Sequence, residues 1–204
     1  MKRVKELPVT DKDWSDKLLK DGWNRIWEPR NLILAVVISF PFVLVLGAVI
    51  LWLAFLQVPE LNPFRSVDSF QITMRIDLKF LVYLVFVYLY MLCHELIHAV
   101  SIPNVWKSDN TVWGLNGLFG FTYTKEPLKK GRFLLVSVMP FVVLSVVPLF
   151  VLPIFGLLNG YTLGLCFINA VGSCVDFLNV LLVMIQVKKG STMINNGFET
   201  FYKM

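Results

Sequence analysis

Charged residues are scarce in this 204-residue chain, where Asp, Glu, Lys and Arg make up 16% and hydrophobic residues make up 56%. That balance excludes an ordinary soluble protein, in which about a quarter of the residues are charged. The net charge of +5 does not indicate a nucleic-acid partner, because the basic residues are scattered between apolar segments and form no patch interleaved with aromatic residues. We therefore expect an integral membrane protein that lies in the lipid bilayer and binds no nucleic acid.

Cysteine is rare as well, and its three copies, Cys93, Cys166 and Cys174, all lie in apolar runs. An odd number without loop spacing excludes a disulfide framework, so we expect small buried hydrophobic side chains. We also expect no cleavable signal peptide, because residues 1–31 are highly charged and the apolar run that follows is long enough to span a membrane. We expect that run to be a retained anchor.

Histidine is rarer still, with two copies in the whole chain. Both belong to Cys93-His94-Glu95-Leu96-Ile97-His98, which is a His-Glu-x-x-His motif. Residues four apart lie one turn above each other on an α-helix, so His94 and His98 can bind one tetrahedral zinc ion. Glu95 lies beside them and can take a proton from a zinc-bound water. The pattern thus predicts a zinc cofactor and a catalytic base.

The same motif can also arise by chance, or as surface decoration on a soluble helix. Residues 80–92, directly before it, are almost wholly apolar. Ionisable groups inside a membrane span are costly and usually functional. The sequence therefore favours a zinc centre within the membrane over a chance occurrence.

Four long apolar runs predict the fold class, an all-α integral membrane protein with about four transmembrane helices and a short cytoplasmic β-hairpin after the second. The first run has 25 residues and no charge, which gives about 37 Å of helix, enough to cross a bilayer with some tilt. Three prolines interrupt the third run, so we expect it to be kinked or to end early. The predicted spans within a membrane domain of residues 32–187 are 32–56, 78–102, 133–158 and 161–187.

The segments on either side of this domain are polar. In residues 1–31, apolar side chains recur at helical spacing after Asp11, which can cap a helix. We predict an amphipathic helix, either in the lipid interface, which three tryptophans favour, or packed on its neighbours as a soluble helix. Residues 188–204 form a polar tail with no readable role. The apolar residues at helical spacing are Trp14, Leu18, Leu19, Trp23, Ile26 and Trp27.

A hairpin is predicted at residues 111–123, because Asn116-Gly117 is typical of a two-residue turn and lies between β-prone flanks. An edge strand there could hold an extended substrate by main-chain pairing. Alternatively, the hairpin only lies at the membrane interface. The residues of the predicted substrate strand are Gly114, Leu115, Asn116, Gly117 and Phe121.

The basic residues also predict which side of the membrane the loops occupy. Eight precede the first span, five lie between the second and third, and three follow the fourth, whereas the opposite side has three, Arg65, Arg75 and Lys79. One side thus has sixteen basic residues and the other has three. By the positive-inside rule, this difference predicts that both termini and the hairpin lie in the cytoplasm.

A third zinc ligand must come from Asp, Glu or Cys, since no third histidine exists. Asp176 is the single ionisable group of the fourth span, and it shares a polar face with Asn169. At about 1.5 Å per residue, Asp176 and His94 lie about 17 and 13 Å from the cytoplasmic ends of their helices, so their depths agree. We predict Asp176 as the ligand; alternatively, it is a hydrogen-bonded packing residue. The other options for the third ligand are Glu126, the runner-up, and then Asp109 and Glu199.

The motif helix, the hairpin after it and the Asp on a later span resemble the site-two protease group of intramembrane zinc metalloproteases. More closely, the whole chain resembles a group of small bacterial membrane proteins classed as putative zincin peptidases. Site-two proteases carry Asn-x-x-Pro and then Asp-Gly on the later span, whereas this chain has Asn169-Ala-Val-Gly-Ser-Cys-Val-Asp176-Phe, without that proline and glycine. The resemblance implies a bacterial plasma membrane, a ligand role for Asp176 and a transition-state or supporting role for Asn169.

These observations predict a zinc-dependent intramembrane metalloprotease. It would hydrolyse a peptide bond of a membrane protein or peptide near the cytoplasmic face, with the zinc-bound water activated by Glu95. The alternative is a non-proteolytic membrane protein in which zinc is structural or the fold binds a partner.

Overall fold

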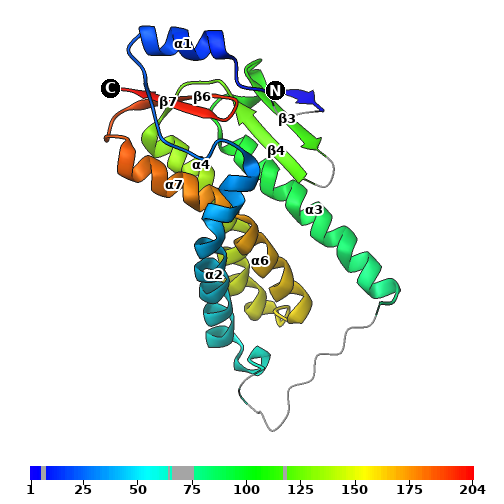
Figure 1. The fold of residues 1–204 in the computed structure, drawn as a ribbon. Coiled ribbons are helices and arrows are strands. Elements are labelled where there is room, and N and C mark those ends of the chain that lie inside the picture. Colours follow the sequence, from blue (N-terminus) through cyan, green and yellow to red (C-terminus); the bar gives the residue numbers. More distant parts are fainter. Residues whose placement is uncertain (6–7, 64, 66–75, 117–118) are drawn as a thin grey trace.

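Four long apolar helices dominate the computed structural model, which describes residues 1–5, 8–63, 65, 76–116 and 119–204. Each is long and apolar enough to cross a membrane, as the sequence predicts, which indicates a multi-pass membrane protein. Figure 1 shows two small sheets and both chain ends gathered at one end of these helices. The four helical stretches are Leu32–Gln57, Leu78–Ser101, Lys130–Phe155 and Gly160–Gln186.

The first two stretches are single helices, α2 (Leu32–Gln57) and α3 (Leu78–Ser101). Each begins where a polar side chain meets the apolar run. Asn31 accepts a hydrogen bond from the Leu34 N–H at 2.9 Å, and Asp77 accepts one from the Phe80 N–H at 2.9 Å. Such caps satisfy N–H groups that have no partner inside the helix. Short 3₁₀ turns follow the two helices, η1 (Pro59–Leu61) and η2 (Val105–Lys107).

The other two stretches are broken, the third at the prolines that predicted a kink. A proline inside a helix removes one backbone donor and pushes the chain out of regular geometry. The fourth stretch is interrupted at Ser173, whose hydroxyl donates to the Asn169 carbonyl at 2.9 Å. The pieces in chain order are α4 (Lys130–Phe141), the π-helical turn η3 (Val142–Val146), α5 (Val147–Val151), the 3₁₀ turn η4 (Leu152–Phe155), α6 (Gly160–Gly172) and α7 (Cys174–Gln186).

The helix core lies between α2, α5 and α6. Ile50, Leu149 and Ala170 are completely buried there. Gly47 allows α2 to approach α6 closely, because a Cβ atom at this position would lie 3.0 Å from the Phe167 ring. This packing places α6 and α7 against α2 and gives the fourth stretch a defined orientation.

The structure is mostly helical, as predicted, and two small sheets extend the single hairpin that the sequence predicted. The predicted hairpin exists as β3 (Thr111–Asn116) and β4 (Phe119–Thr124), paired from Thr111 with Thr124 to Asn116 with Phe119. Its predicted turn residue Gly117 lies outside the described residues. The extreme N-terminus adds a third strand, β1 (Lys2–Val4), parallel to β3. The strand order β1-β3-β4 leaves β4 at one edge of this sheet.

The second sheet is formed largely by the C-terminal tail, for which the sequence indicated no structure. Its order is β2-β7-β6-β5, and all of its pairs are antiparallel. The tail hairpin therefore joins the N-terminal segment to the loop before α4. The strands are β2 (Asn24–Arg25), β5 (Leu128–Lys129), β6 (Thr192–Asn196) and β7 (Glu199–Lys203).

The predicted N-terminal helix is present as α1 (Lys12–Lys20), capped by Asp11, which accepts from the Trp14 N–H at 3.1 Å. It ends before Trp23, so the three last apolar residues of the predicted helical pattern lie beyond it. Leu18 packs in a cluster with Ile194 and Phe201 of the tail. These contacts pack α1 against the tail, and its position in the lipid interface stays a prediction.

Glu28 links the N-terminal segment to this tail. Its carboxylate accepts hydrogen bonds from the Thr200 N–H and, at 3.0 Å, from the Thr200 hydroxyl. Burial raises the pKa of Glu28 from 4.5 to about 7, although the Thr200 hydrogen bonds and nearby Arg25 act in the opposite direction. The folded protein therefore keeps a proton that the unfolded chain releases between pH 4.5 and 7, and this contribution to stability falls as pH rises through that window.

Replacing Glu28 by Gln should flatten this dependence, because Gln keeps an acceptor for Thr200 and never ionises. Thermal unfolding of the detergent-solubilised protein between pH 4.5 and 8 measures the effect. The wild type should lose more stability than the variant as pH rises. Parallel curves for the two proteins would show that Glu28 does not titrate differently in the folded and unfolded states.

Candidate metal centre

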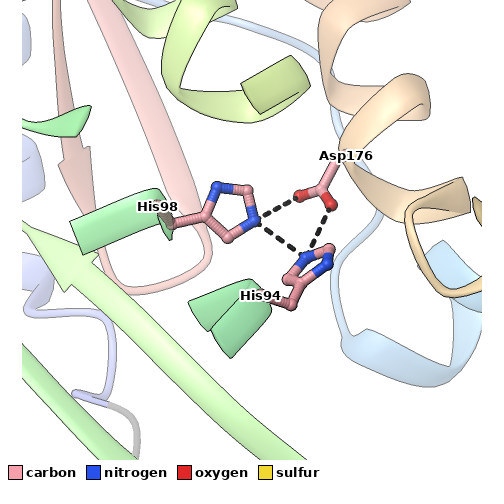
Figure 2. Close-up of side chains that lie close together, drawn as sticks. All are labelled: His94, His98 and Asp176. Carbon is pink, nitrogen blue, oxygen red and sulfur yellow. Dashed lines mark hydrogen bonds and ion pairs between the residues drawn. The ribbon is translucent and has the colours of Figure 1, made fainter. Parts of the chain in front are cut away.

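His94, His98 and Asp176 converge on one point between α3 and α7 (Figure 2). The two histidines lie on consecutive turns of α3, and their Nε2 atoms are 3.0 Å apart. Asp176, in the first turn of α7, places Oδ2 3.4 Å from His94 Nε2 and Oδ1 3.5 Å from His98 Nε2. The structure thus brings together three residues that the sequence predicted as one ligand set.

The orientation of the His94 ring is set by Asn169 on α6. His94 Nδ1 lies 2.9 Å from Asn169 Oδ1, and Asn169 is completely buried. The Asn169 amide nitrogen donates to the Pro140 carbonyl at 3.2 Å and to Ser145 Oγ at 2.7 Å, while the Ser145 hydroxyl donates to the Cys166 carbonyl at 2.8 Å. These partners hold the amide with its oxygen toward the imidazole, so His94 Nδ1 is the donor.

His98 has an equivalent partner on α4. Its Nδ1 lies 2.8 Å from the Val136 carbonyl oxygen, which can only accept a hydrogen bond. In their neutral form both imidazoles therefore carry the proton on Nδ1, and both Nε2 lone pairs point toward the Asp176 carboxylate. In that form three acceptor groups converge, which is the arrangement that a cation satisfies.

The donor set fits zinc. Two imidazole nitrogens and a carboxylate are a common three-ligand set of catalytic zinc, which keeps a fourth position for water or substrate. Two nitrogens bound to one tetrahedral zinc at about 2.0–2.1 Å are about 3.3 Å apart, close to the separation of the two Nε2 atoms. Within the described part of the chain, no fourth His, Cys, Asp or Glu joins this group.

Glu95 lies against the edge strand β4. A Cβ atom on Gly120 would be 2.5 Å from Glu95 Cγ, so glycine is needed for the strand to lie this close to the carboxylate side chain. The Thr122 hydroxyl donates to the Glu95 carbonyl at 2.9 Å and ties the same strand to the motif helix. The free edge of the first sheet therefore passes directly beside the predicted catalytic base.

A cavity of about 660 Å³ lies beside the metal group, Glu95 and the edge strand β4. His94, Glu95, His98 and Asp176 all line it, together with residues of β4 and mostly apolar side chains from α2, α4 and α7. The tail closes another part of its wall. The cavity is large enough for several residues of an extended peptide, and its polar groups are concentrated at the metal group. The lining residues from β4 and the tail are Gly120, Phe121, Thr122, Thr124, Asn195 and Phe198.

The other acidic residues considered as third ligands have partners elsewhere. Glu126 accepts from the Ser108 hydroxyl at 2.6 Å and from the Asn110 side-chain amide at 3.1 Å. Asp109 pairs with Lys2 at 3.2 Å, and Glu199 pairs with Arg25 at 2.7 Å. None of the three belongs to the group that includes the histidines.

The predicted substrate strand is divided by the structure. Gly114, Leu115 and Asn116 lie on β3, whose other edge is paired with β1, at least as far as Gly114 opposite Val4. As far as Gly114, β3 therefore has a paired strand on both sides and no free edge for a substrate. Phe121 lies on β4 and lines the cavity, so it is the member of the set that faces the candidate site.

Four supporting groups were not predicted as site residues. Gly120 and Thr122 fall inside the predicted hairpin, but only the three-dimensional position of β4 shows that they touch Glu95. The Val136 carbonyl and Ser145 belong to the third span. A serine in an apolar run is a weak signal of a polar contact between helices, whereas a backbone carbonyl has no signature in the sequence.

Four apolar helices around a His-His-Asp group, of which His94 is buried, indicate a membrane protein with a candidate metal centre. The chain belongs to the family described as "Putative zincin peptidase", whose model matches residues 85–192, just over half of the chain. The match begins within the first half of α3 and ends at the first residue of β6, so it includes the His-Glu-x-x-His motif and Asp176. Family membership implies zinc, whereas the broader resemblance to site-two proteases stays a prediction. No curated protein and no solved structure matches the chain.

Proposed function

We propose that this protein is a zinc-dependent peptidase that hydrolyses a peptide bond of a membrane protein near the cytoplasmic face of the membrane. The observation that carries the proposal is the convergence of two Nε2 atoms and one carboxylate, with both Nδ1 atoms held by fixed acceptors. Membership of a zincin peptidase family supports the same conclusion.

In this proposal His94, His98 and Asp176 hold the zinc. Bound zinc acts as a Lewis acid that polarises the scissile carbonyl and makes the attacking water more acidic. Glu95 takes the proton of that water and passes it to the leaving amine, because it lies next to the ligands in the cavity without belonging to the ligand group. Asn169 keeps His94 in the tautomer that presents Nε2.

The edge strand β4 holds the substrate. An extended peptide that pairs with β4 would run along the cavity beside Glu95, since Gly120, Phe121 and Thr122 line it. Among the described residues no fourth His, Cys, Asp or Glu joins His94, His98 and Asp176, which leaves a position for water and favours an open catalytic site over a closed structural one.

A comparison of membrane proteomes tests the function. Cells that express the wild type should contain new protein N-termini within or next to transmembrane segments of other proteins, and these should disappear with Glu95→Gln. An unchanged set of termini, with zinc still bound to the purified wild type, would contradict proteolysis and favour a structural zinc or a partner-binding role.

The orientation is part of the proposal, and the excess of basic residues on one side supports a cytoplasmic position for both termini. Single cysteines introduced at Arg65 and Lys107, both exposed, test it with a membrane-impermeant maleimide. Position 65 should react from outside intact cells, and position 107 only after permeabilisation. The reverse pattern would overturn the orientation and place the cavity at the opposite surface.

Gly120→Ala should separate catalysis from zinc binding. The new methyl group requires a displacement of about 1 Å between β4 and the Glu95 side chain, and a misplacement of that size typically costs about 10²-fold in rate. The three atoms nearest to a Cβ atom at Gly120 all belong to Glu95 and none to a zinc ligand, so zinc affinity should stay at the wild-type value. Gly131→Ala is the matched control, because nothing lies within 4 Å of a Cβ atom at that position. Equal turnover of both variants would show that β4 does not position Glu95.

A further inference from the structure

Pro140 lies inside α4, four residues after Val136. In a regular α-helix, the N–H of residue 140 would donate to the carbonyl of residue 136. Proline has no N–H, and its ring clashes with the carbonyl four residues earlier, so that carbonyl is released and tilts away from the helix axis. The Val136 carbonyl is therefore free to accept a hydrogen bond from another helix.

The partner of that carbonyl is His98 of the motif helix, whose Nδ1 lies 2.8 Å from it. We propose that Pro140 is a positioning residue for the metal centre: by withholding one backbone N–H, it supplies the acceptor that fixes the His98 ring with Nε2 toward His94 and Asp176. This inference rests on the proposed zinc peptidase function, but it concerns a residue that touches neither metal nor substrate.

Pro140 also acts on the second imidazole. Its own carbonyl accepts from the Asn169 side chain at 3.2 Å, and Asn169 in turn accepts from His94 Nδ1. The π-helical turn begins at Val142, directly after this region. The backbone hydrogen bonds of the third stretch therefore change there from the α-helical to the π-helical spacing. One proline is thus connected to both histidines, through the Val136 carbonyl to His98 and through Asn169 to His94.

A second proline in the same stretch provides a natural comparison. Pro148 lies four residues after Leu144, whose carbonyl accepts from the Tyr90 hydroxyl on α3. As at Pro140, a proline leaves the carbonyl four residues earlier without its helical N–H donor, and that carbonyl binds a side chain of the motif helix. Tyr90 is not part of the metal group, so Pro148 should have no direct effect on it.

Pro140→Ala restores the missing N–H and should weaken zinc binding. Loss of an outer partner of a ligating histidine typically costs about 10- to 100-fold in metal affinity, which is the decrease expected here. Competition between the purified, detergent-solubilised protein and a chelator, with zinc as the sole added metal, measures it. Pro148→Ala should keep the wild-type affinity, and both variants are compared with the wild type by circular dichroism and thermal unfolding.

A backbone ester separates the missing N–H from the shape of the proline ring. The α-hydroxy analogue of alanine, introduced at position 140 by nonsense suppression, has neither the ring nor an N–H. It should restore wild-type zinc affinity. If Pro140→Ala binds zinc as tightly as the wild type, or if the ester behaves like Ala, the proposal is overturned.

The tautomer of His98 gives a readout that does not depend on zinc. In metal-free protein at alkaline pH, ¹⁵N shifts should show His98 protonated on Nδ1 in the wild type and a growing Nε2–H fraction in Pro140→Ala. With only two histidines in the chain, each signal is assigned by a single substitution. A wild type that binds no zinc would overturn the proposed function, whereas an unchanged tautomer in Pro140→Ala would overturn the role of Pro140.

Discussion

Replacing Glu95 by Gln is expected to lower turnover of a cleaved membrane protein by at least about 10²-fold, and by up to about 10⁴-fold, while one zinc per chain remains bound. Proton transfer by a positioned side chain typically contributes this much to the rate. Gln has the size of Glu and can still donate and accept hydrogen bonds, but it cannot take a proton from the attacking water. Glu95 lies outside the ligand group, so the metal should stay.

The measurement combines metal analysis of the purified variant with its rate of substrate cleavage. Gly131→Ala serves again as a control for the effects of handling and substitution, because this position has open space around it. A Glu95→Gln protein that keeps both zinc and near-normal cleavage would show that the base is another group. Loss of zinc would show instead that Glu95 binds the metal or supports the motif helix.

The part of the site that the sequence predicted consists of residues whose relation is local or follows from the membrane. His94 and His98 are one turn apart on any helix, and the apolar residues before them predict that the helix is a span. Asp176 is about eighty residues away, yet its predicted depth in the membrane matches that of His94, and the structure places it within 3.5 Å of both imidazoles. The predicted depth in the membrane therefore related two residues that are far apart in the sequence. The sequence of a soluble protein offers no such relation.

The parts that sequence reasoning missed depend on pairing between distant segments. β1 joins β3 across more than a hundred residues, and the tail strands β6 and β7 meet β2 and β5. Short strands of two to five residues carry little periodicity of their own. The N-terminal helix likewise ends at Lys20 because the chain turns into β2, although apolar residues continue at helical spacing to Trp27. Tertiary pairing outweighed the local pattern in each case.

The third-ligand assignment yields the other large expected effect. Asp176→Ala should reduce zinc affinity by more than the roughly 10- to 100-fold that typically follows loss of an outer partner, because a direct ligand is removed. Only two imidazoles would remain, fewer than the three protein ligands of a catalytic zinc site. Asp176→Asn keeps the shape and removes the charge, and it should fall between the wild type and Asp176→Ala in affinity.

Glu126→Ala is the matched control for this experiment, because Glu126 was the runner-up in the sequence and the structure engages it with Ser108 and Asn110 instead. Chelator competition on all four proteins should therefore show wild-type affinity for Glu126→Ala and a large loss for Asp176→Ala. Stoichiometric, tightly bound zinc in Asp176→Ala together with its loss in Glu126→Ala would move the third ligand to the loop after β4. That loop would then have to approach the histidines when metal binds, since Glu126 lies outside their group in this structure.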